Sequence, residues 1–369
     1  MNRLFRWDQM GLFLLALAAG ILPFAVPEVC AAALREGLTL CSGPLLLSLF
    51  PFLVVSRLLV QCPESDLLAL PFRLAAWGIG IRTPCAARVL CIGFLGGFAP
   101  AASAAAQAVR TGQLTVEEAD ALLPACICSG PSFVVLTVGQ SLLGSAELGV
   151  LLFASQITAN YLTAALLNRF AGVRSVKPGS AAPASPAPPR LDEILADAAI
   201  TYCKLCGFIL FFRLLAAGAG ALLPAGAGTL CAILLEVCSG CDLASRTGRW
   251  GSLLCCAALS VQGLSVLLQV RTICPPEMTL RPLYRARMLH LPLSLALFYL
   301  LLPGGEADVF STLPVRVLLM RRVPPDCALL VFAVCCMAAC TLRSGIRQVE
   351  QKQMARNAGG CCINSKTLL

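Results

Sequence analysis

Charged side chains are scarce in this chain: Asp, Glu, Lys and Arg together make up only 13% of its 369 residues. A soluble domain normally carries about 25% of such residues. Hydrophobic residues reach 58%, which is more apolar surface than a soluble fold of this length keeps from water. The scarcity of charge therefore excludes an ordinary soluble domain. It predicts an integral membrane protein, in which apolar runs of about 20 residues cross the lipid bilayer.

Histidine is nearly absent, since His290 is the single one in the chain. It stands alone in an apolar run and is expected to be structural or interfacial. The sequence also has no phosphate-binding glycine loop and no nucleophile placed beside a general base. These absences argue against an enzyme and against a bound cofactor.

Cysteine is abundant, with 21 residues, but most of them lie within apolar runs such as Cys255–Cys256 and Cys335–Cys336. There they are expected to act as small hydrophobic residues. A zinc site needs several thiolates or imidazoles at ligand spacing. The stretches 126–128 and 238–241 have suggestive spacing but no second matching pair, so no metal is expected.

The net charge of +9 comes from basic residues scattered between apolar runs, with no long basic stripe that would indicate nucleic-acid binding. Such residues collect in the cytoplasmic loops of membrane proteins. With eight crossings the basic segments fall on one side, which places both termini in the cytoplasm. They are Arg3 and Arg6; Arg73 and Arg82; Arg169, Arg174, Lys177 and Arg190; Arg271, Arg281, Arg285 and Arg287; and Arg343, Arg347, Lys352 and Arg356. A loop with Arg316, Arg321 and Arg322 departs from this pattern.

The expected fold is an all-α membrane protein with about eight transmembrane helices and two re-entrant hairpins. The runs and linkers divide the chain into six segments. They are an N-terminal transmembrane and interfacial helix (1–42), a first repeat (43–170), a Pro/Ala/Ser-rich cytoplasmic linker (171–190), a second repeat (191–303), a loop with a final transmembrane helix (304–343) and a basic cytoplasmic tail (344–369).

Two apolar stretches are interrupted so that each arm is too short to cross the bilayer. The first, 85–110, is interrupted at 96–100, where Pro100 suits the first turn of a new helix. The second, 224–246, is interrupted at 237–241. Both are predicted to be re-entrant hairpins. If each hairpin returns to the side of the membrane from which it enters, the first repeat begins outside the cell and the second begins in the cytoplasm. This inverted arrangement is typical of secondary transporters.

A broken helix is predicted after each hairpin. The first break is Ser129–Ser132 and follows a helix that starts with the capping box Thr115–Glu118; the second is Gln262–Ser265. Gly and Pro free backbone amides and carbonyls at such breaks. A kink that serves packing alone is the alternative interpretation. Two breaks at matching positions beside two hairpins favour a solute site.

Ionisable residues within apolar runs are expensive and are often functional. Glu236 is the candidate for a proton or cation role, or else it sits in water at the mouth of its hairpin. Arg57 and Arg213 each lie late in the first span of a repeat and could together clamp a dicarboxylate. Snorkelling of both side chains to a helix end is the alternative.

Other polar residues support the candidate site or the helix packing. Gln156, Thr158 and Asn160 either join helices or line the solute path, whereas Asp192, Glu193 and Asp197 are expected to be surface charges at a helix start. The full set of candidate solute-binding residues is Gly97, Ser103, Gln107, Ser129, Gly130, Ser132, Glu236, Ser239, Gly240, Gln262, Gly263, Ser265, Arg57 and Arg213.

Four motifs together resemble the sporulation integral membrane proteins of YlbJ type. They are Leu49–Phe52, Gly96–Pro100 with the downstream Arg110–Ala119, Ser129–Phe133 and Gly263–Val270. That family carries the nucleoside-recognition, or Gate, domain, which is related to concentrative nucleoside transporters. This chain departs from the family pattern at the hairpin tip, Gly97–Pro100, and at Cys126–Cys128.

The resemblance implies a role in spore formation in the cell membrane or the outer forespore membrane, with dipicolinate as the leading solute. The first functional hypothesis is therefore a transporter of a small organic anion. The second is a carrier for nucleosides or one coupled to a cation. The third is a non-transporting membrane scaffold needed for spore cortex assembly. The expected partners are the lipid bilayer and a small polar or anionic solute, with a coupling cation and a homo-oligomer left open.

Overall fold

The computed structural model describes residues 2–61, 69–172 and 190–302, and this part of the chain is helical throughout with no strand. Three helical segments are long and apolar enough to cross a bilayer: Ala146–Ala171, Leu191–Leu222 and Gly248–Ile273. A fourth is present if Phe13–Ala25 and Pro27–Ser42, which bend by 114° at their junction, form one span. The protein is thus an all-helical protein with apolar helices that fit a membrane.

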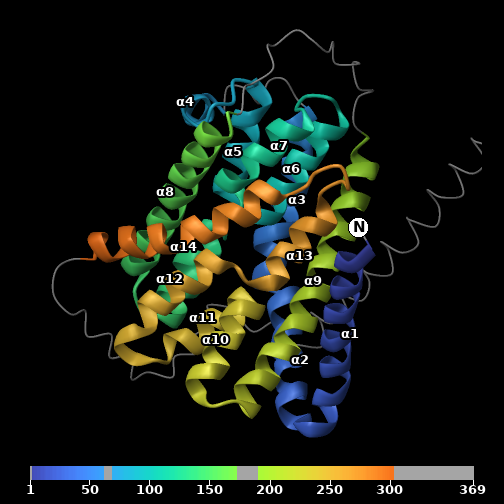
Figure 1. Cartoon of the computed structure of the whole chain (residues 1–369), viewed down its shortest axis with the longest axis vertical. Helices are drawn as coiled ribbons and strands as arrows, with labels where there is room; N and C mark the ends of the chain where they lie inside the picture. The colour runs from blue at the N-terminus through green and yellow to red at the C-terminus, as the bar shows by residue number, and fades with distance from the viewer. Residues whose placement is uncertain (1, 62–68, 173–189, 303–369) are drawn as a thin grey trace, which may run out of the picture.

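The first part of the chain opens with two helices that meet at a sharp bend, α1 (Asn2–Ala25) and α2 (Pro27–Ser42). Pro27 starts α2 because a proline needs no amide partner in the first helical turn. Helix α2 buries one face against α3 (Pro44–Gln61) and α9 (Leu191–Leu222). Figure 1 shows α1 and α2 alongside α9.

Two short helices follow the small helix α4 (Leu70–Gly78), as the sequence predicts for the first hairpin. Helices α5 (Pro84–Gly96) and α6 (Phe98–Arg110) have 13 residues each and pack against each other. Each is about 20 Å long, shorter than the hydrocarbon core of a bilayer. Pro100 lies in the first turn of α6, as expected.

The next helix is broken as predicted, into α7 (Val116–Cys126) and the π-helix η2 (Ser132–Leu142), before the long helix α8 (Ala146–Ala171). The predicted capping box is confirmed, because the Thr115 side chain accepts from the Glu118 amide and the Glu118 carboxylate accepts from the Thr115 amide. The interruption covers residues 127–131, slightly earlier than predicted.

The second half repeats this order. After α9 come α10 (Ala225–Leu235) and α11 (Val237–Ser245), then η3 (Gly248–Trp250), α12 (Gly251–Val261), α13 (Gly263–Ile273) and α14 (Arg281–Leu301). The α12–α13 break lies at Gln262, as predicted. The hairpin break was predicted at 237–241, which is wrong: it lies at Glu236, whose side chain caps α11.

Helix α14 begins earlier than the sequence pattern indicates. The charge pattern places Arg281, Arg285 and Arg287 in a basic segment on the cytoplasmic side, but the helix already starts at Arg281. Arg285 remains exposed, whereas Arg287 is buried, so placing Arg287 in a solvated loop was wrong. The predicted linker, final transmembrane helix and tail fall at 173–189 and 303–369, outside the described residues.

The largest apolar core joins the two halves of the described chain. It contains Ile79 and Leu122 from the first half together with Leu259, Val266 and Phe298 from the second. Most of the described cysteines are buried, which fits their expected role as small hydrophobic residues.

A polar contact also ties the halves together. The buried Asp120 carboxylate of α7 accepts hydrogen bonds from the Thr279 amide (2.9 Å), the Thr279 hydroxyl (2.7 Å) and the Leu280 amide (3.3 Å). Leu280 has φ 56° and is the N-terminal cap of α14. The Asp120 carboxylate therefore stabilises the turn from which α14 starts.

Replacement of Asp120 by alanine is expected to destabilise the protein by about 3 kcal/mol, because three donors lose a charged acceptor in a buried place. Thermal unfolding of the detergent-solubilised protein measures the change. Glu117→Ala is the matched control, since Glu117 is exposed one turn away on the same helix. Equal unfolding temperatures for the two variants would show that the Asp120 contact does not hold the halves together.

Candidate functional site

The first hairpin and the first helix break meet at two glycines. Gly97 joins α5 to α6 with φ 81° and ψ −164°, a conformation that residues with a Cβ rarely adopt. A Cβ at Gly97 would lie 2.7 Å from the Gly130 amide nitrogen, so the two backbones touch. The missing side chain of Gly97 therefore lets the hairpin tip pack directly on the break, whereas a Cβ at Gly130 would come no closer than 3.4 Å to the hairpin, at the Gly96 carbonyl oxygen.

The second half makes the corresponding contact. A Cβ at Gly263 would lie 2.9 Å from the Glu236 amide nitrogen, and Gly263 has φ 71°. Glu236 is buried, and its carboxylate accepts from the amides of Cys238 (2.8 Å) and Ser239 (2.7 Å). Both carboxylate oxygens are thus engaged by the N-terminus of α11. The alternative prediction, that Glu236 lies in water at the mouth of its hairpin, is therefore wrong.

A small cavity of about 50 Å³, here called the central cavity, lies between the first helix break and the break of the second hairpin at Glu236. It brings together four of the predicted site residues, Ser129, Gly130, Ser132 and Glu236, with walls that are otherwise mostly apolar. Gln269 adds an amide that the sequence analysis did not select. Its nitrogen donates to the Ser265 hydroxyl (2.8 Å), whereas its buried oxygen has no protein partner.

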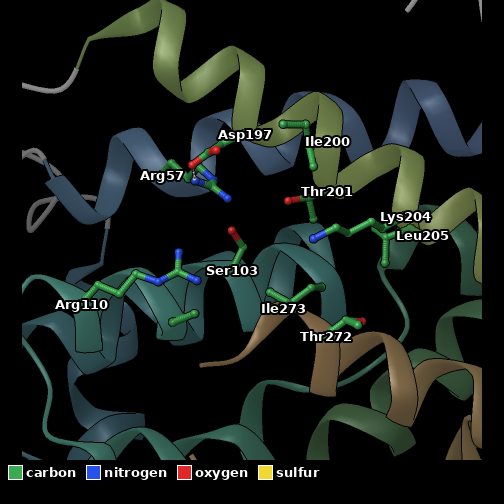
Figure 2. Close-up of a pocket in the computed structure, with 11 residues that line it drawn as sticks. Arg57, Ser103, Arg110, Asp197, Ile200, Thr201, Lys204, Leu205, Thr272 and Ile273 are labelled. Carbon is green, nitrogen blue, oxygen red and sulfur yellow. Dashed lines mark hydrogen bonds and ion pairs between the residues drawn. The ribbon is translucent and has the colours of Figure 1, made fainter. Parts of the chain in front are cut away.

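A second cavity of about 140 Å³ lies between α3, α6, α9 and α13. It contains the cationic side chains of Arg57, Arg110 and Lys204 and one acidic side chain, Asp197. Figure 2 shows the Lys204 amine and the Arg110 guanidinium directed toward the space between α6 and α9, beside the Ser103 hydroxyl. Three positive charges against one negative charge leave an excess of two, so we name it the cationic cavity.

Arg57 forms an ion pair with Asp197 at 2.5 Å, and its side chain is only 10% exposed, against 57% for Asp197. Asp197 was expected to be a surface charge of the α9 start, like Asp192 and Glu193. It is exposed, as expected, and it is also the partner of a nearly buried arginine, which the sequence spacing alone did not indicate.

A third cavity of about 380 Å³, here called the acidic cavity, lies between α2, α9 and α11. Its charged residues are Glu36, Asp242 and Arg213, and Ser239 is also in its wall. Arg213 pairs with Glu36 at 2.9 Å. Arg57 and Arg213 therefore line different cavities, and the structure does not bring them together as a single clamp.

The other predicted site residues have packing positions or lie at the breaks. Gly240 lies against Ile233, where a Cβ would come within 2.8 Å of the Ile233 Cα, so it allows the arms of the second hairpin to approach. Gln107 is half-buried on α6 and lines none of the three cavities. Gln262 is buried at its break, and its amide nitrogen lies 3.4 Å from the Ile127 carbonyl oxygen.

Helix α8 contacts α12, α14 and the C-terminal cap of α7 through polar groups. Gln156 donates to the Ser260 hydroxyl (3.0 Å), Asn160 donates to the Ile127 carbonyl (3.3 Å), and His290 lies 3.2 Å from the Gln156 carbonyl oxygen. Gln156 and Asn160 thus join helices, which was one of the two roles considered for them, whereas Thr158 is exposed. His290 is buried and structural, as predicted.

Arg287 is the main central residue that the sequence analysis missed. Its guanidinium donates to the backbone carbonyls of Ile127 and Ser260. A basic residue with the spacing of a cytoplasmic loop gave no signal that α14 carries it inward. Comparisons of the chain with known protein families, curated proteins and solved structures yield no match.

Proposed function

We propose that this protein is a membrane carrier for a small organic anion, built from two inverted repeats around the central cavity. One observation carries the proposal: α9 lines all three cavities in order along its length. Asp197 to Leu205 face the cationic cavity, Ile209 faces the central cavity, and Arg213 to Ala221 face the acidic cavity. At 1.5 Å per residue this stretch of α9 covers about 36 Å, which is enough to span the hydrocarbon core.

Two further helices connect the cavities. On α13, Gln269 lines the central cavity and Ile273, one turn later, lines the cationic cavity. On α11, Cys238 lines the central cavity and the next residue, Ser239, lines the acidic cavity. Because residues one turn or less apart on the same helix line neighbouring cavities, the three cavities form a series. A series of cavities supports a path for a solute.

The inverted repeat is supported by the pairing of elements. Helices α3, α5–α6, α7–η2 and α8 correspond in order to α9, α10–α11, α12–α13 and α14. The contacts are reciprocal, because α6 packs on α13 while α11 packs on η2, and α8 packs on α12 while α14 packs on α7. Figure 1 shows the two hairpins toward opposite ends of the long axis. Reciprocal contacts are expected from a two-fold relation, and broken helices at its centre from a transporter.

Charge favours an anion as the solute. Arg110 and Lys204 project into the cationic cavity, and among the described residues Asp197 is the one carboxylate that lines it. Guanidinium groups bind carboxylates through paired hydrogen bonds. The resemblance to the sporulation family makes dipicolinate, a dicarboxylate, the first solute to test, with a role in spore formation. Eight crossings and cytoplasmic termini belong to the same proposal.

Uptake of labelled dipicolinate into proteoliposomes tests the function. Replacing Arg110 and Lys204 together by glutamine is expected to lower the initial rate at least about tenfold, which corresponds to 1.4 kcal/mol of lost interaction. Arg281→Gln is the control, because Arg281 is an exposed arginine at the start of α14. Equal rates for the two variants would contradict a role of the cationic cavity in anion transport.

The same vesicles separate the alternatives. Competition of dipicolinate uptake by uridine or adenosine would favour a nucleoside carrier. The absence of flux for both solute classes, with protein that is folded by circular dichroism, would favour the scaffold role.

A further inference from the structure

Arg287 is a buried cation without a buried anion. It is 8% exposed, and no carboxylate pairs with it among the described residues. Its two terminal nitrogens donate to backbone carbonyls, one to Ile127 and the other, at 3.4 Å, to Ser260. A positive charge in apolar surroundings is stable only if some group near it supplies negative potential, and for Arg287 this group is not a carboxylate of the described residues.

The two carbonyls are the ends of half-helices from opposite repeats. Helix α7 ends at Cys126, and Ile127 is its C-terminal cap, while Ser260 lies in the last turn of α12, which ends at Val261. C-terminal carbonyls have no partner within their own helix, and each helix end carries roughly −0.5 elementary charge. Two such ends supply about one negative charge, which balances one guanidinium.

The surrounding side chains also present donors to this point. Asn160 and Gln262 both direct their amide nitrogens at the Ile127 carbonyl, at 3.3 and 3.4 Å. The Ile127 carbonyl is therefore a focus of negative potential, and the described side chains that bond it are two amide donors and the guanidinium. Carriers with broken helices use such C-terminal ends and unwound carbonyls to coordinate a coupling Na⁺ or H⁺.

We propose that the guanidinium of Arg287 takes the place of a coupling cation, so that this protein moves its solute without Na⁺ or another soluble monovalent cation. The covalently attached charge bridges the two repeats permanently. The transport part of this inference rests on the proposed carrier function, whereas the bridging part does not. It leaves no need for a soluble coupling cation at these two helix ends, whereas the role of Glu236 is a separate question.

Thermal unfolding of the purified full-length protein tests the bridge. Arg287→Ala is expected to lower the unfolding temperature by several degrees, and guanidinium chloride at low-millimolar concentration should restore at least half of that loss. Choline chloride at the same concentration should restore none. Arg285→Ala is the control, because Arg285 is exposed two residues away. Its unfolding temperature should equal that of the wild type and should not change with guanidinium chloride.

Wild-type protein gives the second measurement and needs no variant. Its unfolding temperature and its dipicolinate flux are expected to be equal in NaCl and in choline chloride. Stabilisation or faster flux in NaCl would overturn the inference, as would an Arg287→Ala protein that guanidinium fails to stabilise. If no dipicolinate flux occurs in either salt, the proposed transport of dipicolinate fails, while the unfolding temperatures still test whether Arg287 bridges the two helix ends. If Arg287→Ala does not fold, the Na⁺ dependence of the wild-type unfolding temperature decides it.

Discussion

Gly97→Ala is expected to be strongly destabilising, by about 2–6 kcal/mol, and to abolish transport. Two effects add. A residue with a Cβ costs about 1–3 kcal/mol at φ 81° and ψ −164°, and the new methyl group would lie 2.7 Å from the Gly130 amide nitrogen. Overpacking of this kind costs about 1–3 kcal/mol more, because backbone rather than a flexible side chain must move. Thermal unfolding in detergent and dipicolinate flux measure the two consequences.

Gly112→Ala separates the cost of a positive φ from the cost of a steric contact. Gly112 also has a positive φ, 68°, but a Cβ there meets nothing within 4 Å. This variant should show only the smaller backbone cost and keep its flux. Gly263→Ala, with φ 71° and a Cβ 2.9 Å from the Glu236 amide nitrogen, should resemble Gly97→Ala. A Gly97→Ala protein that unfolds at the temperature of Gly112→Ala would show that the hairpin tip does not touch the break.

Removal of the Glu236 carboxylate is the second substitution with a large expected effect. Glu236→Ala leaves the amides of Cys238 and Ser239 without acceptors in a buried place, at a cost of about 3 kcal/mol or more. Glu236→Gln keeps one acceptor oxygen and should lose about half as much. Chemical or thermal unfolding of the two variants gives this ranking.

Asp242→Ala is the matched control for Glu236. Asp242 lies six residues later, and its ion pair with Arg246 is partly exposed, with side chains 32% and 65% accessible. Such a pair contributes about 0–1 kcal/mol. A Glu236→Gln protein with wild-type stability and no flux would instead assign Glu236 the proton or cation role that the sequence also allowed.

The broken helices could be predicted because their signals are local. Gly97, the capping box at Thr115 and the Gln262–Gly263 step each impose a backbone conformation through the chemistry of neighbouring residues. The second hairpin break was misplaced because the predicted glycine, Gly240, serves close helix packing, while Glu236 ends α10 by capping α11.

The pairings across the molecule could not be predicted. Arg57 meets Asp197, and Asp120 meets Thr279, across more than 100 residues of sequence, and neither pair has a spacing rule. Arg287 was misassigned for a related reason. The rule that places arginines in cytoplasmic loops counts charges only. It gives no information about two helix ends from different halves of the chain that converge on one guanidinium.

The charges of the two outer cavities have a kinetic consequence for the proposed path. Arg110 and Lys204 raise the local concentration of an anion at the cationic cavity, whereas Glu36 and Asp242 of the acidic cavity are each paired with an arginine and add no such attraction there. The path would then act as a rectifier at low solute concentration. It would load faster from one compartment than from the other, although at equilibrium an unpowered path leaves the two concentrations equal when no voltage is applied.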